Sequence, residues 1–253
     1  MTRTLVRTLC LTLILTALVA CGKKGPVRPK LLPTPAAPAP VAVEQRGERF
    51  LLSWDIPRKN QDGSSLTDLR GFEIARMRYR PAEDCPECRQ DFVPVRSVDL
   101  EYLQGVRRSG ERLFWWDDQP QPEFGYIYRV TPVTIAGRAG RPAEAGRLYA
   151  PPPSPPQQQQ GTGHDRLVRL DWQPPPDGTG DLLGFYIYRW QPDTPVPLQP
   201  INERPLAETF YQDFAVENGR TYLYSVATAT GIDGDPVQST LPEPVKVTPE
   251  AGK

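Results

Sequence analysis

The stretch DLRGFEIAR, from Asp68 to Arg76, returns more than a hundred residues later as DLLGFYIYR, from Asp181 to Arg189. Both copies fit the pattern D-L-x-G-F-x-I-x-R, in which apolar residues occupy every second position after the glycine. Such alternation is typical of a β-strand with one buried face. We therefore expect one strand in each copy, with these side chains in a hydrophobic core: Phe72, Ile74, Phe185 and Ile187.

Other landmarks repeat in the same order around the two copies. RFLLSWDIP (Arg49–Pro57) precedes the first copy, and RLVRLDWQP (Arg166–Pro174) precedes the second. GYIYRVTPV (Gly125–Val133) and RTYLYSVAT (Arg220–Thr228) follow them, and both contain the pattern Y-x-Y-x-V. The repeated unit is therefore a whole domain of short strands separated by turns, which favours a β-sandwich.

This ordered set of landmarks resembles the fibronectin type III family of immunoglobulin-like domains. The family has a buried Trp on its second strand, which corresponds to Trp54 and Trp172 in this chain. It also has a core Tyr that opens its sixth strand, which corresponds to Tyr126 and Tyr222. The resemblance implies an all-β fold of two tandem immunoglobulin-like (fibronectin type III) β-sandwiches.

The resemblance also implies the domain bounds. Residues 40–150 form the first sandwich, residues 151–248 form the second, and residues 249–253 are a C-terminal tail. The joint between the sandwiches, APPPSPPQQQQGTGHDR, is rich in Pro and then in Gln and Gly. We expect part of Pro153–Gln160 to pair as the first strand of the second sandwich, which leaves a short linker that limits relative motion.

The N-terminus carries the most specific signal. Arg3 and Arg7 precede an apolar run, Leu9–Ala20, that suits a secretory signal peptide better than a membrane span. The run ends in L-V-A-C and resembles a bacterial lipobox, which implies a lipoprotein signal peptide at residues 1–20 and a fatty-acylated Cys21. An ordinary secretion signal with an incidental Cys is the alternative. Because several acyl chains anchor a protein stably, the resemblance predicts a membrane-anchored protein that faces the periplasm.

Residues 21–39 are expected to form an extended, semi-rigid stalk because prolines recur throughout them. In lipoproteins of Gram-negative bacteria an Asp after the Cys signals inner-membrane retention. Gly22 stands there in this chain, so the outer membrane is the expected location. The start CGKKGP resembles that of small envelope lipoproteins, including one that accompanies the lipopolysaccharide-export translocon. Four basic residues in the stalk either contact anionic headgroups or keep the stalk soluble: Lys23, Lys24, Arg28 and Lys30.

Composition and motifs argue against several functions. Thirty basic residues balance thirty acidic ones, which gives no basic stripe for nucleic acid. The only His is His164, in a Gly-rich segment that we expect to be a loop, and a lone His completes no Ser-His-Asp or Cys-His arrangement. Nucleotide-binding and zinc-protease motifs are absent from the sequence. We therefore expect no enzyme activity, no catalytic residue, no metal and no cofactor.

Cys85 and Cys88 lie in PAEDCPECRQD, in an inserted segment of the first domain. Three hypotheses fit a C-x-x-C motif: a structural disulfide, a redox-active dithiol or part of a metal site. The acidic flanks disfavour a thiolate, and zinc requires four ligands where two Cys are present. A disulfide that closes a tight loop in an oxidising periplasm is the favoured hypothesis.

Alternation also predicts a candidate binding surface. If Phe185 faces the core, then Tyr186 and Tyr188 face outward, with Leu223 beside them on a neighbouring strand. An exposed Tyr pair can contact protein or sugar. The alternatives are packing on a solvated sheet face or burial against the first domain, and these are favoured.

Trp115 and Trp116 form a second candidate surface. Adjacent strand residues point to opposite faces, so one Trp is expected in the core and the other partly exposed. The exposed one could stack on a sugar ring, although it more commonly covers a sheet edge or a loop.

The sequence as a whole predicts a non-catalytic, membrane-anchored lipoprotein that binds or spaces partners in the cell envelope. Its partner would be an envelope protein or a polysaccharide. One alternative is a carbohydrate-binding accessory module or a component of a carbohydrate-active enzyme. Another is a periplasmic thiol-disulfide protein that uses Cys85 and Cys88.

Overall fold

Short strands account for almost all regular structure in the computed structural model, which describes residues 32–176, 181–232 and 235–252. Within these ranges the helical structure is one turn of 3-10 helix, η1 (Pro86–Cys88). The chain contains 31 prolines, which leave little room for longer helices. The prediction of an all-β chain is therefore confirmed.

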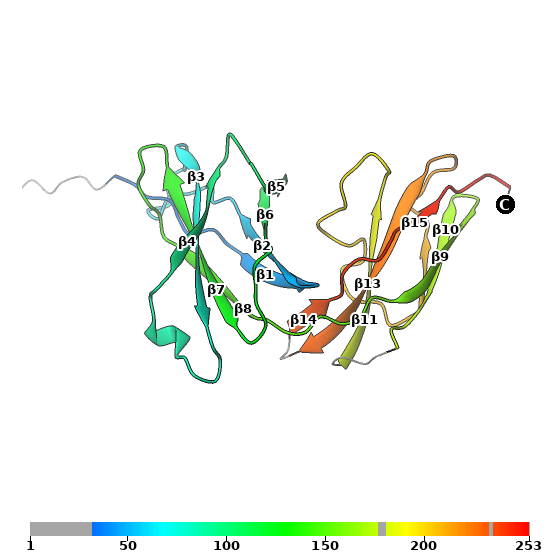
Figure 1. Cartoon of the computed structure of the whole chain (residues 1–253). Coiled ribbons are helices and arrows are strands. Elements are labelled where there is room, and N and C mark those ends of the chain that lie inside the picture. The colour runs from blue at the N-terminus through cyan, green and yellow to red at the C-terminus, as the bar shows by residue number, and fades with distance from the viewer. Residues whose placement is uncertain (1–31, 177–180, 233–234, 253) are drawn as a thin grey trace, which may run out of the picture. The chain divides into compact units, whose positions relative to one another are not determined.

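The first sandwich consists of two sheets that face each other across one core (Figure 1). One sheet contains, in spatial order, β1 (Val41–Arg46), β2 (Arg49–Asp55), β6 (Arg112–Asp117) and β5 (Val106–Ser109). The other contains β4 (Val93–Asp99), β3 (Leu69–Tyr79), β7 (Gly125–Thr134) and β8 (Ala143–Leu148).

The second sandwich repeats this plan around a separate core. One sheet contains, in spatial order, β12 (Phe210–Asp213), β10 (Leu167–Gln173) and β9 (Gln157–His164). The facing strands are β11 (Asp181–Trp190), β13 (Tyr222–Ile232), β14 (Asp235–Gln238) and β15 (Val245–Val247). The two cores confirm the predicted tandem sandwiches, although Pro33–Lys253 forms one compact unit rather than two.

The predicted Trp side chains lie at the centre of each core. Trp54 is fully buried and its ring meets the ring of Phe72 edge to face, with centroids 5.7 Å apart. Trp172 is 4% exposed and meets Phe185 in the same way at 5.4 Å. Edge-to-face pairs add to the stability given by burial alone. The second strand and the repeated phrase thus make the same contact in both halves.

The two predicted core tyrosines form tyrosine corners, a feature of immunoglobulin-like sandwiches. The hydroxyl of Tyr126 accepts a hydrogen bond from the backbone N–H of Gln121 at 2.8 Å. The hydroxyl of Tyr222 accepts one from the N–H of Glu217 at 3.1 Å. Each bond spans five residues and fixes the turn that leads into the strand.

The glycine of the repeated phrase is required where the neighbouring chain passes closely. A Cβ atom on Gly71 would lie 1.8 Å from the carbonyl oxygen of Val98. A Cβ atom on Gly184 would lie 2.2 Å from the carbonyl oxygen of Leu206, and its φ of +131° also favours glycine. In both strands the pairing register shifts beside this glycine, so the phrase encodes a β-bulge.

The Gly-rich segment before His164 is a strand rather than the expected loop. It belongs to β9, which confirms that part of Pro153–Gln160 pairs as the first strand and places His164 at its end. The side chain of Gln159 accepts from the N–H of Val226 at 3.1 Å. A Cβ atom on Gly161 would lie 2.4 Å from the side chain of Val247, so close packing explains the glycine.

The end of the predicted stalk packs on the first sandwich. The N–H of Ala36 donates to Lys59 at 3.0 Å, and the carbonyl of Pro35 accepts from Arg141 at 3.0 Å. A Pro-rich segment cannot form the hydrogen bonds of a helix, so its backbone N–H and C=O groups bond to the neighbouring sandwich instead. Residues 33–39 therefore belong structurally to the sandwich, while residues 21–31 of the stalk, with Cys21, and the signal peptide lie outside the described residues.

Candidate functional site

The two sandwiches share a sheet where β1 meets β14 (Figure 1). The strands pair in parallel, with Gln45 opposite Val237 and Arg46 opposite Gln238. The N–H of Gly47 extends this pairing by donating to the carbonyl of Gln238 at 2.8 Å. Backbone pairing therefore joins sandwiches that the sequence connects only through a Pro-rich linker.

The buried side chain of Gln45 holds the start of that linker. Its amide nitrogen donates to the carbonyl of Ala150 at 2.5 Å, and its amide oxygen accepts from the N–H of Ala150 at 3.0 Å. Gln45 is fully buried, so an unpaired amide there would be costly. The last residue before the prolines is thus fixed to β1.

We call the region where β1 pairs with β14 the junction, and an apolar contact reinforces it. Leu198, in the loop after β11, is buried against Leu51 and Phe114 on the outer face of the first sandwich, and Trp116 packs beside them. In the aligned strands RFLLSW and RLVRLDW, the residue equivalent to Leu51 is Arg169. An apolar residue at a position where the second copy carries a charge is a sequence signal for this contact, and alternation within a single strand does not reveal it.

Three arginines of the first sandwich donate to backbone carbonyls of the second. Arg46 bonds to Leu198 at 2.6 Å, Arg107 to Val196 at 2.7 Å and Arg147 to Pro236 at 2.7 Å. Burial lowers the pKa of Arg147, and the nearby carboxylates of Asp235 and Glu44 oppose this shift. The alternation of strands did not identify these arginines, because the bonds depend on a surface that only the second sandwich supplies.

A pocket of about 320 Å³ opens at this junction. Its polar lining comes chiefly from Arg46, Arg49 and Arg107. Its apolar lining comes chiefly from Val196, Pro197, Leu198 and Leu241. We call it the junction pocket. A second, more polar pocket shares Arg46 and Gln238 with it.

The predicted tyrosine surface is wrong for Tyr188. This side chain is 1% exposed, its hydroxyl donates to Gln238 at 2.7 Å, and the Arg46 guanidinium lies 5.6 Å from its ring centroid. Burial raises its pKa to about 12. The favoured alternative, burial against the first sandwich, therefore holds for Tyr188, because the guanidinium of Arg46 lies over its ring.

Tyr186 and Leu223 do not form one surface. Tyr186 is half-buried and lines the polar pocket, and burial together with the charge of Glu44 raises its pKa. Leu223 is half-buried further along the sheet, opposite Trp190 and Lys246. Tyr186 pairs with Ala227, four residues from Leu223 along β13, so the two side chains are not neighbours.

The two Trp side chains point to opposite faces as predicted. Trp115 packs against the first core, with its ring 6.4 Å from that of Tyr128. Trp116 lies on the outer face and lines the junction pocket. The Arg49 guanidinium sits 4.4 Å from the Trp116 ring centroid, so one face of this ring is already occupied.

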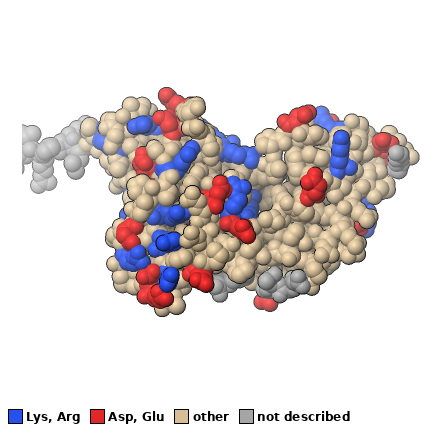
Figure 2. All heavy atoms as spheres, in the orientation of Figure 1, with Lys and Arg blue, Asp and Glu red and all other residues tan. Residues whose placement is uncertain are grey.

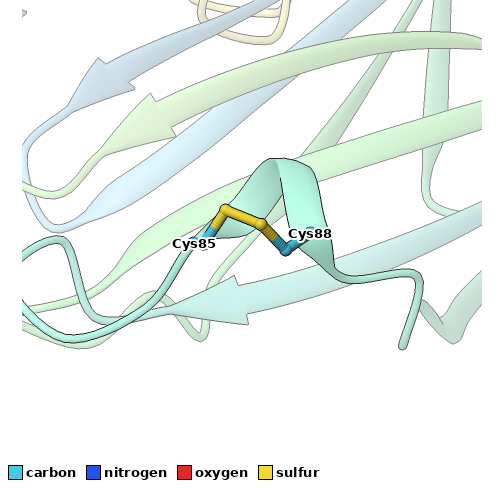
Figure 3. The surroundings of a disulfide bond; sticks show 2 residues. All are labelled: Cys85 and Cys88. Carbon is cyan, nitrogen blue, oxygen red and sulfur yellow. A yellow bond between two sulfur atoms is a disulfide. The ribbon is translucent and has the colours of Figure 1, made fainter.

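Cys85 and Cys88 form a disulfide across η1, which confirms the predicted bond between them (Figure 3). Both residues are exposed at the tip of the loop. Arg89 fixes the loop base through an ion pair with Asp84 at 3.0 Å. The chain therefore positions the disulfide in solvent, away from both cores.

The described residues contain no group of three or more His, Cys, Asp or Glu side chains placed to hold a metal ion. In the same ranges, no helix is long and apolar enough to cross a membrane. On the face drawn in Figure 2, basic and acidic side chains are interspersed over the first sandwich. This mixed distribution agrees with the balanced composition of the chain.

No model of a known protein family matches the chain. Among solved structures, it is similar to the FN1–FN3 domains of chicken CNTN1, at 12% sequence identity and a TM-score of 0.37. The alignment covers 86% of this chain and 69% of the chicken chain. The β-sandwich fold itself follows from the strand order, the paired Trp cores and the tyrosine corners of the present structure.

Proposed function

We propose that the chain is a non-catalytic, lipid-anchored envelope protein whose two fibronectin type III-like sandwiches act together as a binding module or spacer. The sequence L-V-A-C, which ends in Cys21, supports the anchor, and Gly22 in place of an Asp favours the outer membrane. In this proposal the sandwiches face the periplasm and meet an envelope protein.

The parallel pairing of β1 with β14 is the observation that carries the proposal. Two sandwiches joined by a flexible linker would move independently and could not hold one composite surface. Backbone pairing, the Gln45 contact with Ala150 and the buried Leu198 favour a fixed arrangement instead. A fixed pair suits a spacer, and it also suits a site made from both halves.

The anchor is tested by fatty-acid labelling in a Gram-negative host. Cells that express the full chain receive an alkyne-tagged fatty acid, and the protein is followed by fluorescence and membrane fractionation. We expect label and membrane association for the natural chain, and neither for Cys21→Ser. The double variant Cys85→Ser/Cys88→Ser is the matched control and keeps both. A natural chain that stays soluble with Cys21 unmodified would contradict the anchor.

The binding role is tested by photo-crosslinking in cells. A photoreactive residue replaces Val196, which is 42% exposed at the junction pocket, or Glu73, which is exposed on β3. We expect position 196 to capture an envelope protein reproducibly and position 73 not to capture the same protein. If both positions capture the same mixture of proteins, the binding role is contradicted and a spacing role remains.

The exposed disulfide supports a second candidate, a thiol-disulfide protein. Mass spectrometry after treatment with a small dithiol would show rapid exchange at Cys85 and Cys88 if this candidate is correct. The Arg49 guanidinium already lies over one face of the Trp116 ring, so this ring offers a sugar at most its other face.

A further inference from the structure

The junction pocket has a one-sided charge. Three arginines line it, and the lining residues include no carboxylate. Arg46 pairs with Glu44 at 2.6 Å, and Arg49 pairs with Asp118, so both charges are compensated from outside the pocket. Among the described residues, the guanidinium of Arg107 makes one hydrogen bond, to the carbonyl of Val196.

Arg107 is therefore the free cation of the pocket within the part of the chain that the structure describes. A guanidinium carries five N–H donors in a planar fork, and Arg107 uses one of them. The remaining donors match the two oxygens of a carboxylate, which an Arg fork binds in a bidentate manner. The charge at this position favours an anionic group as ligand.

The wall beside Arg107 is aliphatic. Val196 is 42% exposed, although Leu198 in the same loop is buried, and Leu241 also lines the pocket. A volume of about 320 Å³ lies at the small end of ligand sites, enough for a few side chains. Arg49 lies over one face of the Trp116 ring, so that face is closed to a sugar ring.

We propose that the junction pocket binds a short peptide segment of an envelope protein that combines an acidic residue with aliphatic neighbours. The carboxylate of the segment pairs with Arg107, and an aliphatic side chain packs between Val196 and Leu241. The ligand touches both sandwiches, so the site exists only while the junction is closed. This inference rests on the proposed binding function and names the chemistry of the partner.

The test measures fluorescence anisotropy of a labelled probe peptide with the sequence Leu-Glu-Leu-Glu-Leu, added to the full chain in mild detergent. We expect binding to weaken about tenfold or more in Arg107→Gln, because a charge-assisted bond is lost. The control Arg58→Gln removes an exposed arginine that pairs only loosely with Glu111, at 3.9 Å, and leaves binding unchanged. Binding of the neutral peptide Leu-Gln-Leu-Gln-Leu is expected to be weaker by a similar factor.

A second variant guards against an indirect effect of Arg107→Gln. Val196→Asp places a carboxylate beside Arg107 at an exposed position, so it should compete with the peptide and abolish binding while the fold is kept. Equal affinity for the acidic and neutral peptides would overturn the proposal. So would full binding in Arg107→Gln, or tighter binding of a polygalacturonate oligosaccharide than of the acidic peptide.

The two proposals fail separately. If the peptide does not bind but Cys21 is lipidated and crosslinking captures an envelope protein from position 196, the peptide chemistry is wrong and the binding function stands. If Cys21 is unmodified, the envelope function falls, and the affinity of the pocket for the acidic peptide is unaffected by that result.

Discussion

Arg189, the last residue of the second repeated phrase, donates a hydrogen bond to the buried carboxylate of Asp213 at 2.7 Å. The hydroxyl of Tyr224 donates to the same carboxylate at 2.8 Å. The first sandwich repeats the arrangement, with Arg76 and Tyr128 both donating to Asp117. The arginine that both copies of the phrase share thus neutralises a carboxylate that is buried between the sheets.

Removing this arginine should destabilise the second sandwich. In Arg189→Met the carboxylate of Asp213, which is 2% exposed, keeps only its hydroxyl and backbone donors. Arg189 is partly exposed, so water replaces some of the loss, and we expect the free energy of unfolding to fall by about 2 kcal/mol. Urea unfolding followed by Trp fluorescence measures this change.

Arg204→Met is the matched control for this variant. Arg204 is exposed in the same sandwich, and the change should alter stability by less than about 0.5 kcal/mol. Equal effects of the two substitutions would mean that the buried carboxylate does not depend on Arg189.

Tyr188 makes the stability of the protein depend on pH in the alkaline range. Burial raises its pKa from 10.0 to about 12. Above pH 10 the unfolded chain releases this proton while the folded chain keeps it, so stability is full below pH 10 and is lost as pH rises toward 12. At the upper end of this pH range, the shift lowers the free energy of unfolding by roughly 2–3 kcal/mol.

The variant Tyr188→Phe isolates this contribution. It loses the bond to Gln238, so it should be less stable than the natural chain at neutral pH. Between pH 10 and 12 its stability should fall less steeply, because one shifted group is gone. Urea unfolding at a series of pH values measures both slopes, and parallel curves for the two proteins would contradict the assignment.

The strands and the two Trp cores could be predicted because they depend on local alternation. Trp54 and Phe72 occupy alternate positions that face inward whatever lies outside the sandwich. The same rule correctly placed Tyr188 on the outer face of its sheet, but it could not say what covers that face. The cover comes from Arg46, which lies more than a hundred residues away in the other sandwich.

The junction could not be predicted for the same reason. Pairing of β1 with β14 joins segments that share no sequence pattern, and its register follows from the three-dimensional packing. The local sign of the junction is that the first copy has Leu51 where the second copy has Arg169. Comparing the outward positions of repeated domains therefore recovers contacts that comparison of their cores misses.

Leu198 should contribute to the stability of the junction. It is 8% exposed and packs against Leu51 and Phe114, so Leu198→Ala should cost about 2–3 kcal/mol. Val196→Ala in the same loop is the matched control, since its side chain is 42% exposed and should cost less than about 1 kcal/mol. Urea unfolding compares the two, and equal costs would mean that the loop is not docked on the first sandwich.

Gln45 should determine how rigidly the sandwiches are held. In Gln45→Ala the N–H and carbonyl of Ala150 both lose their side-chain partner, and the start of the linker is released from β1. Spin labels at Glu73 and Lys246, exposed residues on strands of the two sandwiches, report the distribution of distances between them. We expect a narrow distribution in the natural chain and a broader one in Gln45→Ala.

Gln61→Ala supplies the comparison for this measurement. Gln61 is an exposed glutamine of the first sandwich whose amide donates to Thr34 at 2.9 Å, and it has no hydrogen bond to Ala150. Its removal should leave the distance distribution narrow. If the natural chain already gives a broad distribution, the pairing of β1 with β14 does not hold the sandwiches together in solution, and a pocket built from both halves has no fixed shape to offer a ligand.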